Sequence, residues 1–250
     1  MTTNINSIDI NSGNLVISYS SGSTNPDKEP LTAVLKGINS YDDYVKCQTA
    51  FQPGTCNDSK DYFTIIINND NRVTDLTVSN QNNGFISTEI GLLDKLTNIE
   101  FQSSTTDFSK PIPTEIGLLT NLERYISQSA YPKGSTIPTE FGKLTNLNNL
   151  TIWEGLLTGT IPTELASLSN LKFLVLRGNC LNITKAGADI LKGLSTYIID
   201  KNCIPKDEYG LKGITQLNCK ACNYCNSLDI CSPDKEPLTA VLKGINSYDD

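Results

Sequence analysis

Four glutamates at regular spacing are the groups in this sequence that could first suggest acid–base chemistry. They are Glu89, Glu115, Glu140 and Glu164, and successive members lie 26, 25 and 24 residues apart. An enzyme built on them would need a partner group, and histidine is absent from all 250 residues. That absence excludes imidazole proton transfer, Ser-His-Asp and Cys-His nucleophiles and H-E-x-x-H zinc sites. Because one glutamate per repeat is typical of a solvated outer ridge, we expect no enzymatic activity.

Cysteine thiols are the second group that could do chemistry. Of the eight cysteines, Cys219, Cys222, Cys225 and Cys231 follow the pattern C-x2-C-x2-C-x5-C. Close thiolates can bind zinc or an iron–sulfur cluster, but zinc ribbons usually hold two C-x2-C pairs far apart, and the ferredoxin run has three residues before its last cysteine. We therefore expect two disulfides in a small capping or spacer module, and neither a metal site nor a cofactor.

The other four cysteines suit further disulfides. Cys180 and Cys203 would staple the last repeat to the segment on its C-terminal side, and Cys47 with Cys56 would close the first cap. An even number of cysteines is typical of a disulfide framework in an oxidising compartment. The first residues lack the basic start and apolar core of a signal peptide. These two observations agree if the chain is a fragment of a larger extracellular or cell-surface protein.

A phrase that recurs along the chain predicts the elements that position these groups. IPTEIGLLTNL from Ile112 returns as IPTEFGKLTNL from Ile137 and IPTELASLSNL from Ile161, and a divergent copy, ISTEIGLLDKL, starts at Ile86. A fixed period of this size is typical of a solenoid, whose repeats bury their apolar faces by stacking. A short apolar alternation beside each phrase predicts a strand with one buried face. The proline and the three-residue apolar spacing within the phrase predict a 3-10 or short helical turn.

The whole pattern, L-x-x-L-x-L-x-x-N-x-L followed by G-x-I-P-x-E-L-x-x-L-x-x-L, resembles plant-type leucine-rich repeats. LNNLTIWEGLLTGTIPTELASLSNL matches nearly every position, and about five repeats cover residues 72–194. Residues 26–71 resemble the N-terminal cap of the same family, with a helical apolar pattern, a loop that holds Cys47 and Cys56, and a strand at YFTIIIN. The family's tryptophan before the second cysteine is missing, and its asparagine position is filled only by Asn179. The middle repeats are therefore expected to be irregular.

The resemblance implies an α/β repeat solenoid: a curved right-handed horseshoe with a parallel sheet on the concave face, short 3-10 or helical turns on the convex face, and disulfide-stapled caps. It also implies an extracellular ectodomain, receptor-like or polygalacturonase-inhibitor-like, that binds protein, peptide or glycan ligands. In the repeat frame, the outward strand residues expected to form the ligand-binding patch include Glu100, Gln102, Ile126, Gln128, Thr151, Trp153, Glu154, Val175 and Arg177. Trp153, the single tryptophan, is either a binding anchor or local packing.

The remaining segments are less regular. Residues 1–25 alternate weakly and are interpreted as a remnant or linker that could form a short hairpin, and residues 195–232 as a cysteine-rich C-terminal cap or spacer. The segment PDKEPLTAVLKGINSYDD occurs at 26–43 and again, without a mismatch, at 233–250. Either a tandem array of units of 207 residues, the offset between 26 and 233, is interrupted here, or the identity is a gene-assembly join.

The net charge of −7 and the pI of about 4.7 argue against nucleic acid or anionic lipid as partners. No stretch has the length and apolarity of a membrane span. Sequons at Asn57, Asn149 and Asn182 leave glycosylation open. Two functions remain as hypotheses: a recognition module, or a structural subunit of a surface or fibre whose repeated units contact one another. Ice binding by strand Thr and Ser residues is a third idea, which charges and irregular spacing disfavour.

Overall fold

The structure is a computed structural model in which the outermost segments are described by their backbone alone. It describes residues 5–11, 14–19, 26–38, 56–58, 61–68, 70, 72–79, 84–102, 107–199, 202, 209, 211, 214–216 and 238–240. Six of the cysteines expected to form disulfides, Cys47, Cys203, Cys219, Cys222, Cys225 and Cys231, lie outside these residues.

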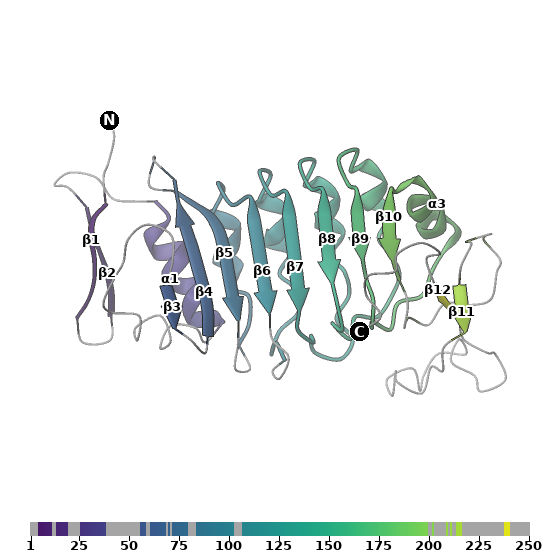
Figure 1. Cartoon of the computed structure of the whole chain (residues 1–250), viewed down its shortest axis with the longest axis horizontal. Helices are drawn as coiled ribbons and strands as arrows, with labels where there is room; N and C mark the ends of the chain where they lie inside the picture. Colours follow the sequence, from purple (N-terminus) through teal and green to yellow (C-terminus); the bar gives the residue numbers. More distant parts are fainter. Residues whose placement is uncertain are drawn as a thin grey trace.

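One sheet of eight strands runs the length of the described repeats (Figure 1). In spatial order its strands are β3 (Cys56–Asp58), β4 (Asp61–Ile67), β5 (Val73–Ser79), β6 (Asn98–Gln102), β7 (Arg124–Gln128), β8 (Asn149–Ile152), β9 (Phe173–Val175) and β10 (Thr196–Ile198). The strands from β5 to β10 pair in parallel, and β3, β4 and β5 pair antiparallel. The alternating apolar segments therefore form the parallel sheet expected of the repeats.

The recurring phrase forms the opposite side of each coil. It supplies the 3-10 turns η1 (Thr88–Leu92), η2 (Thr114–Leu118), η3 (Thr139–Lys143) and η4 (Thr163–Ser167). Pro113, Pro138 and Pro162 precede the last three turns with φ between −70° and −59°, close to the value that the proline ring imposes. The coil after η4 carries a full helix, α3 (Lys185–Gly193), whose first turn is capped by the Thr184 hydroxyl accepting the Gly187 N–H at 3.1 Å.

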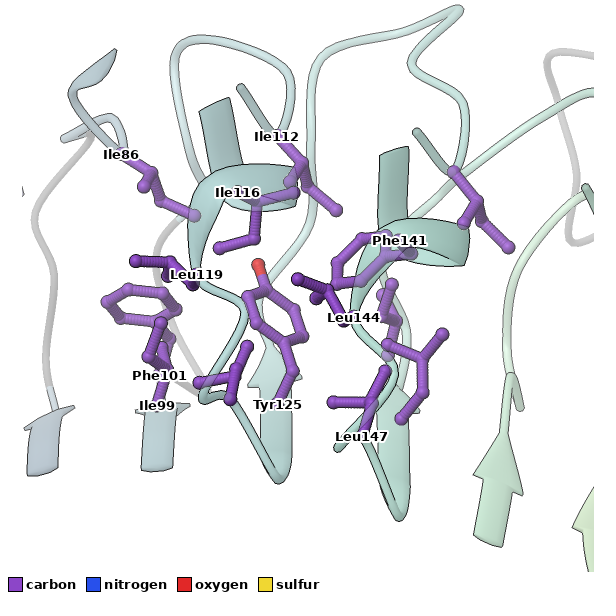
Figure 2. Close-up of a cluster of buried hydrophobic side chains, with 14 of the residues drawn as sticks. Ile86, Ile99, Phe101, Ile112, Ile116, Leu119, Tyr125, Phe141, Leu144 and Leu147 are labelled. Carbon is purple, nitrogen blue, oxygen red and sulfur yellow. The ribbon is translucent and has the colours of Figure 1, made fainter. Parts of the chain in front are cut away.

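Leucine and isoleucine columns fill the space between sheet and turns (Figure 2). The closing leucines Leu96, Leu122 and Leu147 are fully buried, and each contributes about 1.5–3 kcal/mol through burial. Neighbouring turns approach so closely that an added Cβ on Gly117 would lie 2.6 Å from the Cβ of Glu140. This contact explains why glycine recurs inside the phrase.

An aromatic cluster fills the core of the middle repeats, where the asparagine position holds Ala130 and Gly155. The rings of Phe108 and Tyr131 stack at 5.0 Å, and Phe101 and Tyr125 meet Phe108 and Phe141 edge-on at 5.5 and 5.1 Å. The buried Tyr131 hydroxyl lies 3.1 Å from that of Tyr125 and 2.7 Å from that of a serine on β7. The irregularity expected of these repeats is therefore an aromatic core with its own hydrogen bonds.

Buried asparagines hold the last two coils. The Asn179 amide donates to the carbonyls of Ile152 and Leu176 at 2.8 and 2.9 Å and accepts the N–H of Leu157 at 3.1 Å. Asn202 repeats this pattern one coil later, accepting the Leu181 N–H at 3.1 Å. Together with β10, this shows that the sheet continues past residue 194, where the sequence had suggested that the repeats end.

A second asparagine column lies at the ends of the turns. The side-chain amides of Asn121, Asn146 and Asn170 donate to carbonyls of the preceding coil at 2.7, 2.9 and 2.8 Å. Each of these residues is the Asn of the T-N-L or S-N-L that closes the phrase. The conspicuous repeat thus encodes a hydrogen bond between coils as well as a leucine for the core.

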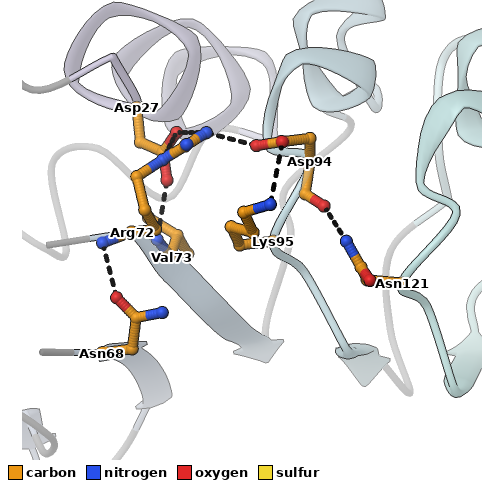
Figure 3. A network of polar contacts seen from close by, with 7 residues as sticks. All are labelled: Asp27, Asn68, Arg72, Val73, Asp94, Lys95 and Asn121. Atoms are coloured by element: carbon orange, nitrogen blue, oxygen red, sulfur yellow. Dashed lines mark hydrogen bonds and ion pairs between the residues drawn. The ribbon is translucent and has the colours of Figure 1, made fainter. Parts of the chain in front are cut away.

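The N-terminal cap helix forms where the sequence predicted it. α1 (Lys28–Gly37) follows the buried Asp27, whose carboxylate accepts the Arg72 Nε–H at 2.8 Å and the Val73 N–H at 2.7 Å (Figure 3). Arg72 also pairs with Asp94 in the first repeat, so one arginine joins the cap to the solenoid. This ion pairing raises the pKa of Arg72 and keeps it charged.

Three observations concern the peripheral segments. The first 25 residues contain a hairpin, β1 (Ile5–Asn11) with β2 (Asn14–Tyr19), as the alternation suggested. Cys56 was expected in a loop, but it begins β3 because its backbone pairs with that of Phe63. β11 (Ile214–Gln216) pairs antiparallel with β12 (Leu238–Ala240).

Candidate functional site

The outward side chains of the parallel strands form three rows, because neighbouring parallel strands lie in register. We call their surface the concave face. The first row is Asp75, Asn98, Arg124, Asn149, Phe173 and Thr196. The second row is Thr77, Glu100, Ile126, Thr151, Val175 and Ile198. The third row contains Gln102 and Gln128, and the residues that follow β8 and β9, Trp153 and Arg177, extend it.

The structure places the residues that the sequence assigned to ligand binding on this face or at its edge. Gln102, Gln128 and Glu154 are exposed. Glu100, Thr151, Trp153, Val175 and Arg177 are partly exposed. Ile126 differs, since its side chain is only 8% exposed and offers little surface to a ligand. Its row neighbours stand on adjacent strands about 5 Å away on both sides, a spacing at which they cover a small aliphatic group. The binding role of the set remains a prediction.

The end of the face near β5 to β7 is polar. Glu100 accepts a hydrogen bond from the amide of Gln102, and the guanidinium of Arg124 lies 4.0 Å from its other oxygen. On β6 the side-chain oxygen of Asn98 is shielded from solvent and, within the described residues, lacks a hydrogen-bond partner. At this end of the face the buried Asn98 oxygen therefore lies on the same strand as the Glu100 carboxylate, whose charge Arg124 partly offsets.

The end near β8 to β10 is apolar and aromatic. Phe173 is 44% exposed, one of the four large hydrophobic side chains that the described surface leaves exposed. Val175 and Ile198 are partly exposed in the next row, and the Arg177 guanidinium lies 5.6 Å from the centre of the Trp153 ring. This distance suits a cation–π contact. The Trp153 Nε1–H is shielded from solvent and has no hydrogen-bond partner in the described part of the chain.

Sequence reasoning missed Phe173. It stands between Leu171 and Leu174 in LKFLVL, so the same alternation that assigned Val175 to the outside also assigns Phe173 there. The omission came from considering only positions after the second leucine of each repeat. Phe173 lies in the first row of the concave face, two residues before Val175 on the same strand.

A tight turn follows the tryptophan. Glu154 and Leu156 have φ of 55° and 53°, in the left-handed region that costs a non-glycine residue about 1–2 kcal/mol. Gly178 occupies the place of Glu154 one coil later with φ of 71°, and a Cβ there would lie 2.8 Å from the Glu154 Cγ. The Glu154 N–H donates to the Arg177 carbonyl at 2.8 Å. The hydrogen bond and the close approach at Gly178 thus join the turn after Trp153 to the next coil.

The recurring glutamates are not arranged as acid and base. Thr114, Thr139 and Thr163 each hydrogen-bond the glutamate that follows, at 3.3–3.4 Å, so the column runs along the turns. A hydrogen bond from Ser87 lowers the pKa of Glu89, which keeps that carboxylate ionised at neutral pH and unsuited to donate a proton. Among the residues described, no three His, Cys, Asp or Glu side chains gather as metal ligands would. Across the same residues, no helix combines the length and the apolarity that a membrane span needs.

Cys180 is the one expected disulfide residue whose side chain is described. It is 7% exposed and disulfide-bonded. It directly follows Asn179, just as Cys203 directly follows Asn202. The two cysteines therefore hold equivalent positions in the sequence pattern, and their pairing stays a prediction.

Comparison with solved structures gives matches of the same architecture. A plant ice-binding protein aligns with a TM-score of 0.53 and 21% identity, over 72% of this chain and 57% of the other. The complex of BIR3 and SERK2 from Arabidopsis thaliana aligns with a TM-score of 0.54 and 22% identity, over 72% of this chain and 95% of the other. The leucine-rich-repeat ectodomain of the plant membrane receptor kinase GASSHO1/SCHENGEN3 from Arabidopsis thaliana aligns with a TM-score of 0.50 and 27% identity, over 57% of this chain and 17% of the other.

These matches extend over different shares of the similar proteins. This chain spans little more than half of the ice-binding protein and a small part of the receptor kinase ectodomain. A scan against protein-family models gave no match. A search of curated proteins gave no match either. The coil geometry and the structural matches agree, and the chain is a leucine-rich-repeat solenoid similar to the ectodomains of plant receptors of that type.

Proposed function

We propose that this chain is a non-enzymatic recognition module that binds a protein or peptide ligand through the concave face in an extracellular setting. The observation that carries the proposal is the aromatic end of that face, where Phe173 is 44% exposed in the first row and Arg177 lies over the Trp153 ring in the third. Exposing a large aromatic ring to water is unfavourable, and Trp, Arg and other aromatic groups are frequent anchors of protein interfaces. A ligand that covered this end would remove that cost.

Chemistry across the face adds to the proposal. The side chains of Gln102, Gln128 and Glu154 are exposed and offer amide donors and carbonyl or carboxylate acceptors to a ligand. Gln102 and Gln128 lie opposite each other on adjacent strands about 5 Å apart. A peptide lying across the strands could therefore hydrogen-bond successive side chains of this row.

The absence of catalysis and the extracellular location belong to the same proposal. The chain contains no histidine, and Cys180 is disulfide-bonded, which suits an oxidising compartment. The matched receptor kinase ectodomain is described in complex with CASPARIAN STRIP INTEGRITY FACTOR 2, which supports a binding role for this type of ectodomain. A glycan ligand remains the alternative within this proposal.

The experiment is a selection followed by matched variants. The immobilised chain is panned against a randomised linear peptide library and tested in parallel on a glycan array. Binding of the selected ligand is then measured for the unmodified chain and for Phe173→Ser, Trp153→Ala and Leu118→Ser. Leu118 is 56% exposed on η2, on the other side of the coil, and serves as the control for loss of an exposed apolar group.

We expect the two concave-face variants to weaken binding at least tenfold, which is about 1.4 kcal/mol and typical of an anchor residue. Leu118→Ser should bind as the unmodified chain does. Binding that depends on Leu118 and not on Phe173 or Trp153 would move the ligand to the turn side and overturn the proposal. Circular dichroism of each variant checks that the fold is retained.

A further inference from the structure

The cap helix α1 is held on the solenoid by three separate contacts. Its apolar face, Leu31, Val34, Leu35 and Ile38, is at most 2% exposed. At its start the buried carboxylate of Asp27 binds the side chain of Arg72 and the N–H of Val73. The third contact lies at its end.

At the end of α1 the backbone itself is docked. The Gly37 carbonyl accepts the Phe85 N–H at 2.7 Å, and a Cβ on Gly37 would lie 2.7 Å from the Phe85 oxygen. Gly84 faces the same junction, where a Cβ would lie 2.6 Å from the Ile38 carbonyl carbon. The site therefore accepts a helix with glycine at this position and has no room for a side chain there.

The chain contains a second segment that meets all three requirements. Residues 233–250 repeat residues 26–43 without a mismatch. The counterpart of Asp27 is Asp234, and that of Gly37 is Gly244. The apolar anchors recur as Leu238, Val241, Leu242 and Ile245.

The second occurrence of the segment shows that its sequence does not by itself specify a helix. Leu31–Ala33 lie within α1, whereas the identical Leu238–Ala240 form strand β12 against β11. A helix of ten residues is marginal in water without tertiary contacts. The cradle formed by Arg72, Val73 and the loop at Phe85 is what the helix requires.

We propose that the α1 site of one molecule can be occupied by residues 233–250 of a second copy of this chain, so that copies associate head to tail by segment exchange. α1 lies at one end of the row of coils and β10 at the other (Figure 1), and the donor segment follows β10 in sequence. Donor and acceptor are therefore different surfaces, which makes the contact heterologous and able to propagate into open chains. This inference does not depend on the ligand of the concave face, and it gives the structural-array hypothesis a physical contact.

Competition inside each molecule controls the exchange. The resident α1 and the incoming segment make the same contacts, but α1 is tethered to its site and has the higher effective concentration. The unmodified chain is therefore mainly monomeric when dilute. Weakening the contacts of α1 alone should let residues 233–250 of another molecule occupy the site. Weakening the contacts of α1 and of residues 233–250 together should return the advantage to the tethered α1.

The test uses the full chain and the variants Asp27→Ala, Asp234→Ala and the double variant, each measured by light scattering after size exclusion over a concentration series. We expect Asp27→Ala to associate at concentrations at least tenfold lower than the unmodified chain. We expect Asp234→Ala and the double variant to remain monomeric where Asp27→Ala associates. Equal association of Asp27→Ala and the double variant would mean that a damaged cap simply aggregates, and it would overturn the proposal.

A peptide gives a second readout that does not depend on oligomers. A labelled peptide with the sequence of residues 233–250 should bind the double variant and shift its fluorescence anisotropy, because the double variant has two weakened competitors. The same peptide carrying Ala at the position of Asp234 should bind at least tenfold more weakly. Equal binding of the two peptides, or binding of neither, would contradict the exchange.

Discussion

Replacing Asn179 with alanine tests whether the buried asparagines hold the last coils together. The Asn179 side chain is fully buried, and its amide joins its own coil, at Leu176, to the preceding coil, at Ile152 and Leu157. Alanine would leave the Leu157 N–H without its partner, and the carbonyls of Ile152, Leu176 and Arg177 would each lose a donor. A buried polar group left unsatisfied costs about 1–3 kcal/mol, and the missing amide also leaves a small void. We expect a loss of about 3–5 kcal/mol in the free energy of unfolding.

The matched control is Asn146→Ala. The Asn146 amide makes one hydrogen bond between coils, to the Thr120 carbonyl at 2.9 Å, in an exposed position where water can replace it. Its loss should cost about 0.5–1.5 kcal/mol. Urea unfolding followed by circular dichroism gives both values, and hydrogen exchange should show faster exchange of the Leu157 amide in Asn179→Ala. If Asn179→Ala lost no more stability than Asn146→Ala, burial would not be the source of the energy and the reasoning would be wrong.

Two further predictions concern packing and pH. Gly142→Ala should lower the free energy of unfolding by about 1–3 kcal/mol, because its Cβ would lie 2.5 Å from that of Glu164, whereas Gly193→Ala, with nothing within 4 Å, should be neutral or slightly stabilising in urea unfolding. Burial raises the pKa of Tyr131 to about 12 from its ordinary value near 10, so its neutral phenol contributes about 3 kcal/mol of stability that is complete below pH 10 and lost as the pH rises towards 12. Urea unfolding at pH 9 and pH 11.5 should show a smaller loss in Tyr131→Phe than in the unmodified chain, and equal losses would contradict this assignment.

Much of the fold could be predicted because its determinants repeat. The closing leucines, the prolines and the alternation specified strands and turns, and Asp27 before an apolar helical pattern specified α1. The end of the array was harder to locate. Asn202 stands 23 residues after Asn179, with Tyr197 and Ile199 in the leucine positions, and those substitutions beside cysteines obscured a further coil. Asn202 identifies this further coil only through its hydrogen bonds to the backbone of Leu181, Leu176 and Ile199.

The exposure of single side chains on the concave face could be predicted less well. Alternation says which way a strand residue points, and it pointed Ile126 and Val175 outward alike. The structure buries the first and leaves the second partly exposed, because exposure depends on which side chains stand on the neighbouring strands. Those neighbours come from residues about 25 positions away in sequence, and their rotamers are not encoded in the period.

The contrast between the inward and outward rows bears on which function the solenoid serves. Inward positions that stack on one another repeat, as in the closing leucines Leu96, Leu122, Leu147 and Leu171, which are at most 6% exposed. The first row of the concave face does not repeat: it runs Asp, Asn, Arg, Asn, Phe and Thr across six strands. A surface that recognised a periodic partner, such as a crystal lattice, would gain most from the same group on every coil. Coil stacking constrains the inward rows and leaves the concave face free to vary, so the variety on that face supports the proposed recognition of a partner that is itself irregular, such as a peptide or protein.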